Sequence, residues 1–240
     1  MYGAVYTILE HRTSFLVGTL MHQGRGLHFV PDSEWLKERT FVIHFPENFK
    51  AEDGLKIIVR IVSFDHPMIV EWQQTLGHLS DPGVDITSIL AAHHIFSGYS
   101  QEVLAEARAL GTSVKEEELA GREDLSKIQT VTIDGEDARD FDDAISVERE
   151  DGGWRLRVSI ADVSHYVKAG GVLDQEAFKR GCSSYVSDRV VAMLPPELSN
   201  GICSLNPHVV RLTNTCDMHV EEDGTIRSCR LYASWICSKA

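Results

Sequence analysis

The sequence predicts an α+β protein that is mainly β, with a small strand barrel, a helical connector and a second strand-rich region. Three observations predict this class. Short apolar runs separated by glycine and proline fill residues 1–75, helix-like segments with capping residues occupy 76–126, and apolar and polar residues alternate again within 127–240. These three ranges are the predicted domains. The length of 240 residues, 43% of them hydrophobic and 25% charged, fits one large or two modest folded domains.

Five short strands are predicted in the first region, and together they suggest a closed barrel. They are Gly3–Leu9, Phe15–Leu20, Leu27–Val30, Phe41–Phe45 and Leu55–Val62. An OB-fold barrel is the economical interpretation because it binds single-stranded nucleic acid on its strand face, although an SH3-like barrel shows the same strand pattern and stays open. Tyr6, Phe15 and Phe29 are candidates for stacking on bases and equally for the core.

The connector is predicted to contain a turn and two helices. The turn is Asp81–Asp85, and the helices are Ile86–His94 and Ser100–Leu110. Ser100 is a suitable N-cap and Gly111 a suitable C-cap for the second helix. We expect the acidic run Glu116–Glu118 to be a solvated helix face, which implies no binding partner.

The third region is predicted to be strand-rich. The expected strands are Thr130–Ile133, Ala144–Val147 and Trp154–Ile160, followed by a helix at Leu173–Arg180 and a hairpin formed by Leu212–Val220 and Thr225–Ile236. In the third strand, alternation places Trp154, Leu156, Val158 and Ile160 on one face. The helix is followed by Gly181 as a C-cap.

Charge and cysteine content exclude several classes of protein. With 23 basic and 36 acidic residues the net charge is −13, so contacts to RNA or DNA must come from a local basic stripe or from sequence outside this chain. The five cysteines form no C-x-x-C pair, which argues against a disulfide framework or a zinc knuckle. No signal peptide or membrane span is apparent, so we expect a cytoplasmic protein without membrane contact. The sequence indicates no particular protein partner.

The segment Thr132–Ala144 concentrates four aspartates, Asp134, Asp140, Asp142 and Asp143, after a β-branched run. Carboxylates held this close raise one another's pKa, so a cluster that stays ionised needs a cation or water to neutralise it. Hard divalent cations prefer such oxygen ligands, provided that the loop curls to bring all four together. An EF-hand is excluded because its sixth position lacks glycine in every register, whereas a solvated acidic turn stays open.

Several segments resemble the ribonuclease II and ribonuclease R family, in particular the ribonuclease R branch. The most specific is Thr132–Ala144, which reads T-I-D-G-E-D-A-R-D-F-D-D-A, and it is supported by Trp154–His165, Met193–Pro207 and Asp81–Asp85. Members of this family degrade RNA from the 3′ end, one nucleotide at a time. The resemblance implies a cold-shock OB-fold domain in 1–75 and the N-terminal part of an RNB exoribonuclease domain in 127–240.

The resemblance also implies roles for the aspartates. Asp134, Asp140, Asp142 and Asp143 align with the four catalytic aspartates that hold magnesium, with manganese as an alternative, and the water that attacks the last phosphodiester. Asp142 would be the most sensitive to substitution. The implied reaction is processive, metal-dependent hydrolysis of single-stranded RNA to nucleoside 5′-monophosphates.

Two further residues gain expected roles in RNA binding. Tyr185 resembles the aromatic residue that stacks on a base several nucleotides from the 3′ end and sets the length of the final product; without the resemblance it would be a half-buried loop tyrosine. Arg139 lies between two of the aspartates, where it could contact phosphate or neutralise the loop.

The chain departs from the family pattern at its end. In the family the RNB domain continues to an arginine near the scissile phosphate, a second set of aromatics and a basic S1 domain, whereas this sequence stops at Ala240. We therefore expect an internal piece of a longer enzyme. The alternative function is a catalytically incomplete, RNA-binding fragment of such an enzyme.

Overall fold

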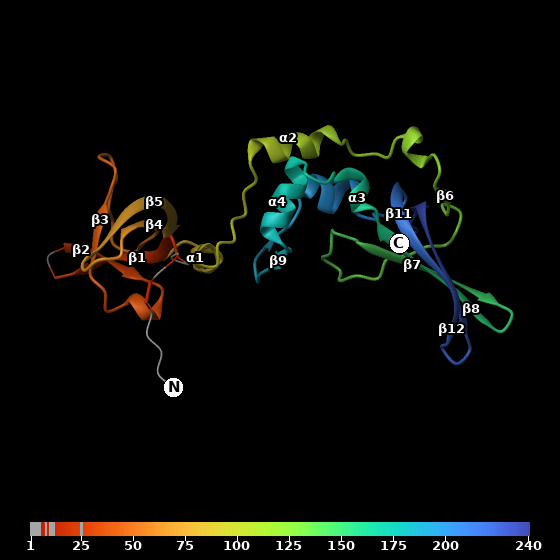
Figure 1. The fold of residues 1–240 in the computed structure, drawn as a ribbon, viewed down its shortest axis with the longest axis horizontal. Helices are drawn as coiled ribbons and strands as arrows, with labels where there is room; N and C mark the ends of the chain where they lie inside the picture. Colours follow the sequence, from red (N-terminus) through yellow and green to blue (C-terminus); the bar gives the residue numbers. More distant parts are fainter. Residues whose placement is uncertain (1–5, 8, 10–12, 25) are drawn as a thin grey trace. The chain divides into compact units, whose positions relative to one another are not determined.

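A computed structural model of the 240-residue chain describes residues 6, 7, 9, 13–24 and 26–240 (Figure 1). Its contacts divide the described chain into two compact units. The first contains the residues up to Phe96 together with Val186–Arg189, and the second contains Ser97–Tyr185 and Val190–Ala240. Among the described residues, no helix is long and apolar enough to cross a bilayer.

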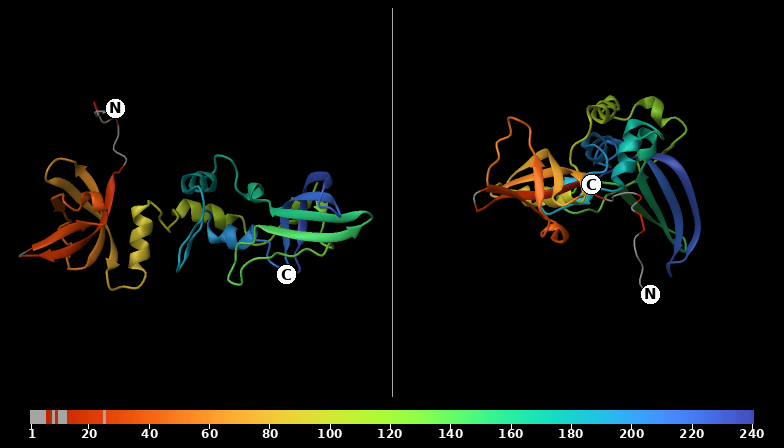
Figure 2. Two further views of the ribbon diagram at one scale, coloured as in Figure 1. Left: turned by 90° about the horizontal axis from the view of Figure 1, so that it is seen from below. Right: turned by 60° about the vertical axis from the view of Figure 1, so that its left-hand side comes forward.

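The first unit is built on a five-stranded, nearly closed barrel with OB-like topology (Figures 1 and 2). Its strands are β1 (Phe15–Gln23), β2 (Gly26–Pro31), β3 (Phe41–His44), β4 (Leu55–Ser63) and β5 (Met68–His78). The strand order is β2-β1-β4-β5-β3, in which β3 runs parallel to β5 and the other pairs are antiparallel. A 3₁₀ turn (Glu34–Leu36) and helix α1 (Val84–Ala92) complete the regular structure of the unit.

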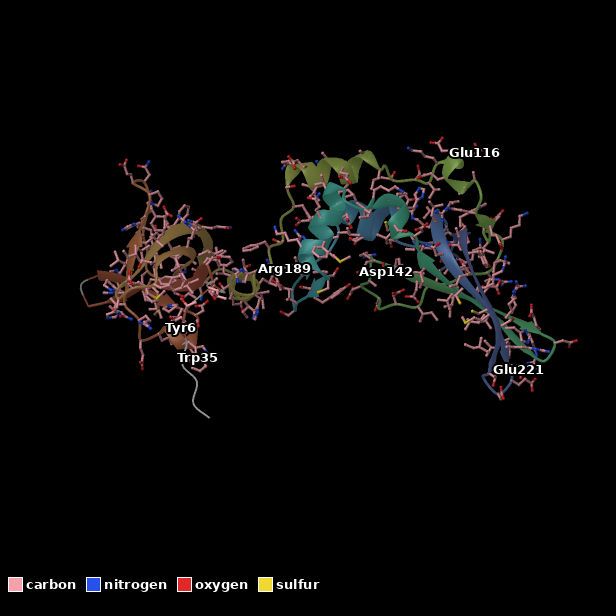
Figure 3. The ribbon with its side chains drawn as sticks, viewed as in Figure 1. Tyr6, Trp35, Glu116, Asp142, Arg189 and Glu221 are labelled. Carbon is pink, nitrogen blue, oxygen red and sulfur yellow. The ribbon has the colours of Figure 1, made fainter. Side chains whose placement is uncertain are left out.

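The barrel core decides the role of the predicted aromatics. Phe29 is buried and meets Phe41 edge to face at a centroid separation of 5.3 Å, so it belongs to the core. Phe15 lies 4.2 Å from the His94 ring and packs partly buried against the cluster around Val17. Tyr6 is fully exposed (Figure 3).

Four of the five predicted barrel strands are confirmed. Most of the fifth, Gly3–Leu9, lies outside the described residues. The barrel instead contains β5, which the sequence analysis missed. The reason is the composition of this strand, because Glu71, Gln73 and Gln74 interrupt its apolar pattern where the strand is only partly buried.

The second unit is built on a five-stranded sheet with the order β6-β12-β11-β8-β7. Its strands are β6 (Glu123–Asp124), β7 (Asp143–Glu150), β8 (Gly153–Ala161), β11 (Val210–Glu221) and β12 (Ile226–Cys237). Only the β6–β12 pair is parallel. The predicted hairpin is confirmed as β11 and β12, which form a long twisted ribbon beside β8 (Figure 2).

Helices and a small hairpin accompany this sheet. They are α2 (Gln101–Ala109), α3 (Val163–Tyr166), α4 (Val172–Arg180), a 3₁₀ turn (Glu116–Leu119), a π-helical turn (Glu197–Ile202), β9 (Ser184–Tyr185) and β10 (Val190–Val191). The cap of α2 is as predicted, since the Ser100 side chain accepts a hydrogen bond from the Val103 amide. Leu173, Leu198 and Ile202 are almost completely buried in the core that these helices share.

One local prediction is wrong. Thr130–Ile133 is not a regular strand, because Val131 forms only an isolated bridge to Ile145, while Thr130 and Thr132 each have a single backbone hydrogen bond to the chain end at 239–240. The acidic run at 116–118 is a largely solvated helical turn, as predicted, with Glu116 and Glu117 exposed. Glu118 is half-buried, contacts His165 Nε2 at 2.7 Å and accepts a hydrogen bond from the Lys115 amide.

The alternation along β8 is confirmed, but the polar face of the strand is the buried one. Trp154 and Ile160 are 40% and 47% exposed, whereas Arg157 and Ser159 are 6% and 2% exposed. A buried polar face requires internal partners for every charge. Period-2 alternation therefore identified the strand without indicating which face is covered.

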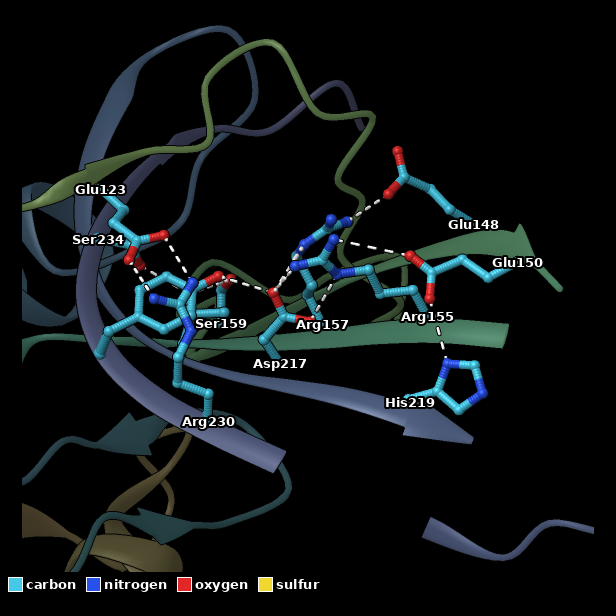
Figure 4. A network of polar contacts seen from close by, with 12 residues as sticks. Glu123, Glu148, Glu150, Arg155, Arg157, Ser159, Asp217, His219, Arg230 and Ser234 are labelled. Carbon is cyan, nitrogen blue, oxygen red and sulfur yellow. Dashed lines mark hydrogen bonds and ion pairs between the residues drawn. The ribbon is translucent and has the colours of Figure 1, made fainter. Parts of the chain in front are cut away.

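Those partners form a network across β8, β11 and β12 (Figure 4). Asp217 accepts hydrogen bonds from Arg155 at 2.9 and 2.8 Å, from Arg157 at 3.3 Å and from the Tyr232 hydroxyl at 3.1 Å. The Arg155 hydrogen bonds hold the pKa of Asp217 below its usual value, against the opposing effect of burial. Nearby, the buried hydroxyls of Ser159 and Thr215 are hydrogen bonded at 2.7 Å.

Candidate active site

The four aspartates lie on one loop and on the strand that follows it. The loop joins Val131 to β7, and it turns where the Ala138 amide donates to the Gly135 carbonyl. Asp143 is the first residue of β7 and pairs with Ile160 of β8. Asp134, Asp142 and Asp143 are exposed and Asp140 is half-buried. Asp142 is labelled in Figure 3.

Ser204 holds the middle of this loop in place. Its side chain is fully buried, and its hydroxyl donates to the Arg139 carbonyl at 2.8 Å while accepting from the Phe141 amide at 3.1 Å. The Leu205 amide donates to the Phe141 carbonyl, and the Phe141 ring packs against the cluster that contains Leu205. The backbone on both sides of Asp140 is therefore fixed.

A further backbone contact fixes Asp142. Its carbonyl accepts a hydrogen bond from the Ala161 amide at 2.9 Å, which joins the end of the loop to the end of β8. The carbonyl of Ser204 is itself held by the buried Arg211, whose Nε donates to it at 2.8 Å. Main-chain contacts from two distant segments thus set the path of the loop, while its carboxylates stay accessible to solvent.

The four carboxylates interact electrostatically at Asp142. The pKa of the Asp142 carboxyl is raised, first by partial desolvation and then by the negative charges of Asp140, Asp143 and Asp134. All three other aspartates are therefore near enough to influence it. Mutual repulsion of this kind is relieved by a bound cation.

The donor set fits a hard divalent cation, but the ligands are not gathered around one point. Carboxylate oxygens are the ligands that Mg²⁺ and Mn²⁺ prefer. In the described part of the chain, however, no three acidic, histidine or cysteine side chains come together as a metal site would require. Coordination of one cation by these residues would therefore require the aspartate side chains of the loop to rotate toward one another.

Tyr185 contacts one of the aspartates directly. It lies on the short strand β9, is 67% exposed, and its hydroxyl donates a hydrogen bond to Asp140 Oδ2 at 2.8 Å. This bond raises the pKa of the Tyr185 phenol. Asp140, Asp142 and Tyr185 line a cavity of about 350 Å³, whose apolar side is formed by residues such as Val163 and Met193.

The structure brings Tyr185 together with Asp140 and Asp142, which line one cavity with it, whereas Arg139 does not line that cavity. The Arg139 side chain is exposed and forms no ion pair with any described residue. The hydrogen bond from the Ser204 hydroxyl to its carbonyl positions its backbone. The sequence analysis assigned no role to Ser204. Ser204 lies within the Met193–Pro207 segment that carries the family resemblance, but its partners are 63 and 65 residues away, so no local pattern could identify it.

Comparison with known families finds a cold shock domain followed by an RNB domain, in the order that the sequence analysis expects. The cold shock domain family matches residues 28–100 and the RNB domain family matches residues 122–240. The second match contains the aspartate loop, Ser204 and Tyr185.

Individual relatives agree with these matches. Ribonuclease R of Thermotoga maritima is 43% identical over 99% of this chain, and ribonuclease R of Escherichia coli is 38% identical over 98%. The structure of Mycoplasma genitalium RNase R in complex with ribose methylated single-stranded RNA matches with a TM-score of 0.89 and 32% identity, covering 98% of this chain and 38% of that one. The chain spans 34% and 29% of the two curated relatives' lengths. With a cold shock domain, an RNB domain and this degree of identity, the chain belongs to the ribonuclease II and ribonuclease R family, on the ribonuclease R branch.

Proposed function

We propose that this chain belongs to a 3′-to-5′ exoribonuclease, which hydrolyses single-stranded RNA processively to nucleoside 5′-monophosphates. The observation that carries the proposal is the set of four carboxylates, Asp134, Asp140, Asp142 and Asp143, on one loop and the start of β7. Ser204 holds this loop through the Arg139 carbonyl and the Phe141 amide, and the raised pKa of Asp142 agrees with the crowding of the carboxylates. Its RNB-family context supports the reaction, and the naming of the relatives as ribonuclease R supports the substrate.

The residues divide the proposed work between metal and RNA. Asp134, Asp140, Asp142 and Asp143 would hold Mg²⁺, or alternatively Mn²⁺. The bound cation would lower the pKa of a water molecule and stabilise in-line displacement at the phosphodiester. The ring of Tyr185 would stack on a base, a contact that contributes about 1–3 kcal/mol.

The rest of the chain would bind and deliver the RNA. We propose residues 1–75 as the RNA-binding barrel, 76–126 as the connector and 127–240 as the N-terminal part of the RNB domain. Arg139 would contact a phosphate, since its side chain is exposed and forms no ion pair with any described residue. We place the protein in the cytoplasm, and its five free cysteines agree with a reducing compartment.

A second candidate function is that of an RNA-binding fragment with incomplete catalytic machinery. One observation favours it: in the part that the structure describes, no three candidate ligands come together. Under this alternative the barrel binds RNA while no phosphodiester is hydrolysed.

The experiment compares three forms of the 240-residue chain on 5′-labelled single-stranded RNA: wild type, Asp142→Asn and Asp137→Asn. Asp137 is a matched control because it is an exposed aspartate of the same loop outside the four. A ladder that requires Mg²⁺, persists in Asp137→Asn and vanishes in Asp142→Asn supports the nuclease. Intact RNA with all three forms, when circular dichroism shows folded protein and fluorescence anisotropy shows RNA binding, supports the fragment.

A further inference from the structure

We infer that the Tyr185 hydroxyl acts as a latch on Asp140, so that metal binding at the aspartates and base stacking on Tyr185 promote each other. The inference rests on the proposed function and deepens it. In the latched state the phenol donates to Asp140. In the released state Asp140 turns toward the other carboxylates and the Tyr185 ring is free to meet a base.

The first observation is the contact itself. The Tyr185 hydroxyl donates to Asp140 Oδ2 at 2.8 Å, and it joins a residue expected to bind RNA to a residue expected to bind metal. The two residues are 45 positions apart on separate elements, the aspartate loop and β9. The ring is 67% exposed, so it can move without disrupting the core.

The second observation is that the backbone around Asp140 is fixed while its side chain is not. Ser204 binds the Arg139 carbonyl and the Phe141 amide, so the main chain of Asp140 has little freedom. The carboxylate of Asp140, by contrast, has the Tyr185 hydroxyl as its hydrogen-bond partner. A rotation of this one side chain can therefore exchange one partner for another at small cost.

The third observation decides between a latch and a support. A hydroxyl on a metal-binding carboxylate usually orients that carboxylate as a ligand. Here the Tyr185 bond coexists with an arrangement in which no three candidate ligands among the described residues come together. The bond occupies Asp140 Oδ2 in this dispersed arrangement, so breaking it frees that oxygen for the gathered one.

Linkage gives the consequence. If metal binding removes Asp140 from Tyr185, it releases the ring for stacking. By thermodynamic reciprocity, a base that captures the ring releases Asp140 for the metal by the same factor. The proposed enzyme would thus assemble its metal site most readily when RNA is in place.

The test uses Tyr185→Phe, which keeps the ring and removes the hydroxyl, in the 240-residue chain. Tyr232→Phe is the matched control because it also removes a phenol that donates to an aspartate, at Asp217 on the other network. Titration calorimetry with Mg²⁺ in the absence of RNA is expected to show roughly three- to tenfold tighter binding for Tyr185→Phe and no change for Tyr232→Phe. This is the size expected of an ordinary hydrogen bond and below that of one to a buried charged group, because the contact is exposed.

A second readout follows RNA by fluorescence anisotropy. Mg²⁺ is expected to tighten the binding of single-stranded RNA to the wild-type chain more than to Tyr185→Phe, because in the variant the ring is already free.

Unchanged or weaker Mg²⁺ binding by Tyr185→Phe overturns the latch, and weaker binding assigns the hydroxyl a supporting role instead. If Asp142→Asn abolishes Mg²⁺ binding in that case, the proposed metal site still stands. If wild type binds no Mg²⁺ at all, both the latch and the metal site fail.

Discussion

Replacing Ser204 with alanine is expected to loosen the aspartate loop without unfolding the protein. The substitution removes one hydroxyl that serves two backbone groups, the Arg139 carbonyl at 2.8 Å and the Phe141 amide at 3.1 Å. The site is fully buried, so water does not simply replace the hydroxyl. The change therefore leaves a donor and an acceptor without their partner.

The magnitude follows from those two groups. A buried group left unsatisfied costs about 1–3 kcal/mol. Arg139 and Phe141 lie on a loop that is partly exposed and can relax, so neither group keeps its full penalty. We therefore expect a loss of about 2 kcal/mol for the second unit, roughly the sum of one weak and one moderate contribution. Ser199→Ala is the matched control, since the Ser199 hydroxyl makes bonds of 3.5 and 3.1 Å and is only half-buried.

The assay combines urea denaturation with residue-resolved hydrogen exchange. We expect a lower midpoint for Ser204→Ala, near-wild-type behaviour for Ser199→Ala, and faster exchange of the Phe141 amide while the β11–β12 amides keep their protection. Equal stability of both variants, together with an unchanged Phe141 exchange rate, would show that Ser204 does not hold the loop and would refute the reasoning.

Three other predictions concern the second unit. Asp217→Asn should destabilise it by about 3 kcal/mol in chemical denaturation, because the guanidinium groups of Arg155 and Arg157 lose their shared buried carboxylate. The control Glu222→Gln alters an exposed ion pair with Arg149, 3.5 Å apart, and should change stability by less than about 0.5 kcal/mol. Equal effects of the two substitutions would contradict the network. The pKa of Asp217 is lowered by Arg155, so the stability it contributes is complete above its unfolded pKa of about 4 and is lost as the pH falls through the lower folded value. Denaturation midpoints between pH 5 and 2 should therefore fall less steeply for Asp217→Asn than for wild type, and parallel curves would exclude this linkage. Burial raises the pKa of the Cys203 thiol to about 12, so at pH 8 a thiol reagent should label the exposed Cys182 and leave Cys203 unlabelled until the chain unfolds, as peptide mass spectrometry can show.

Local chemistry predicted much of this fold correctly. The N-cap at Ser100, the hairpin of β11 and β12 and the strand around Leu156 each depend on residues close together in the chain, and each is confirmed. The strand at 130–133 was wrong because β-branched residues favour extended backbone whether or not a partner strand is present. The strand β5 was missed because its partly exposed half tolerates polar residues.

The candidate site also has features that the sequence predicts and features that depend on the folded chain. The aspartate-rich segment, the absence of an EF-hand glycine and the family resemblance follow from the order of residues alone. The coupling at Asp142, the Ser204 contacts and the Tyr185 hydroxyl bond do not, because each joins segments distant in sequence or depends on the folding of the loop. For the same reason, alternation along β8 could not reveal that Arg157 is buried and Trp154 is exposed.

By itself the sequence determined which chemical groups are present and which local structures they favour: four carboxylates in one loop, a tyrosine downstream, and strands of period two. Only the tertiary structure decided which groups meet. A hydrogen bond or a charge interaction depends on separation in space, and it was the packing of the loop against Ser204 and Leu205 that held Asp140 within reach of Tyr185.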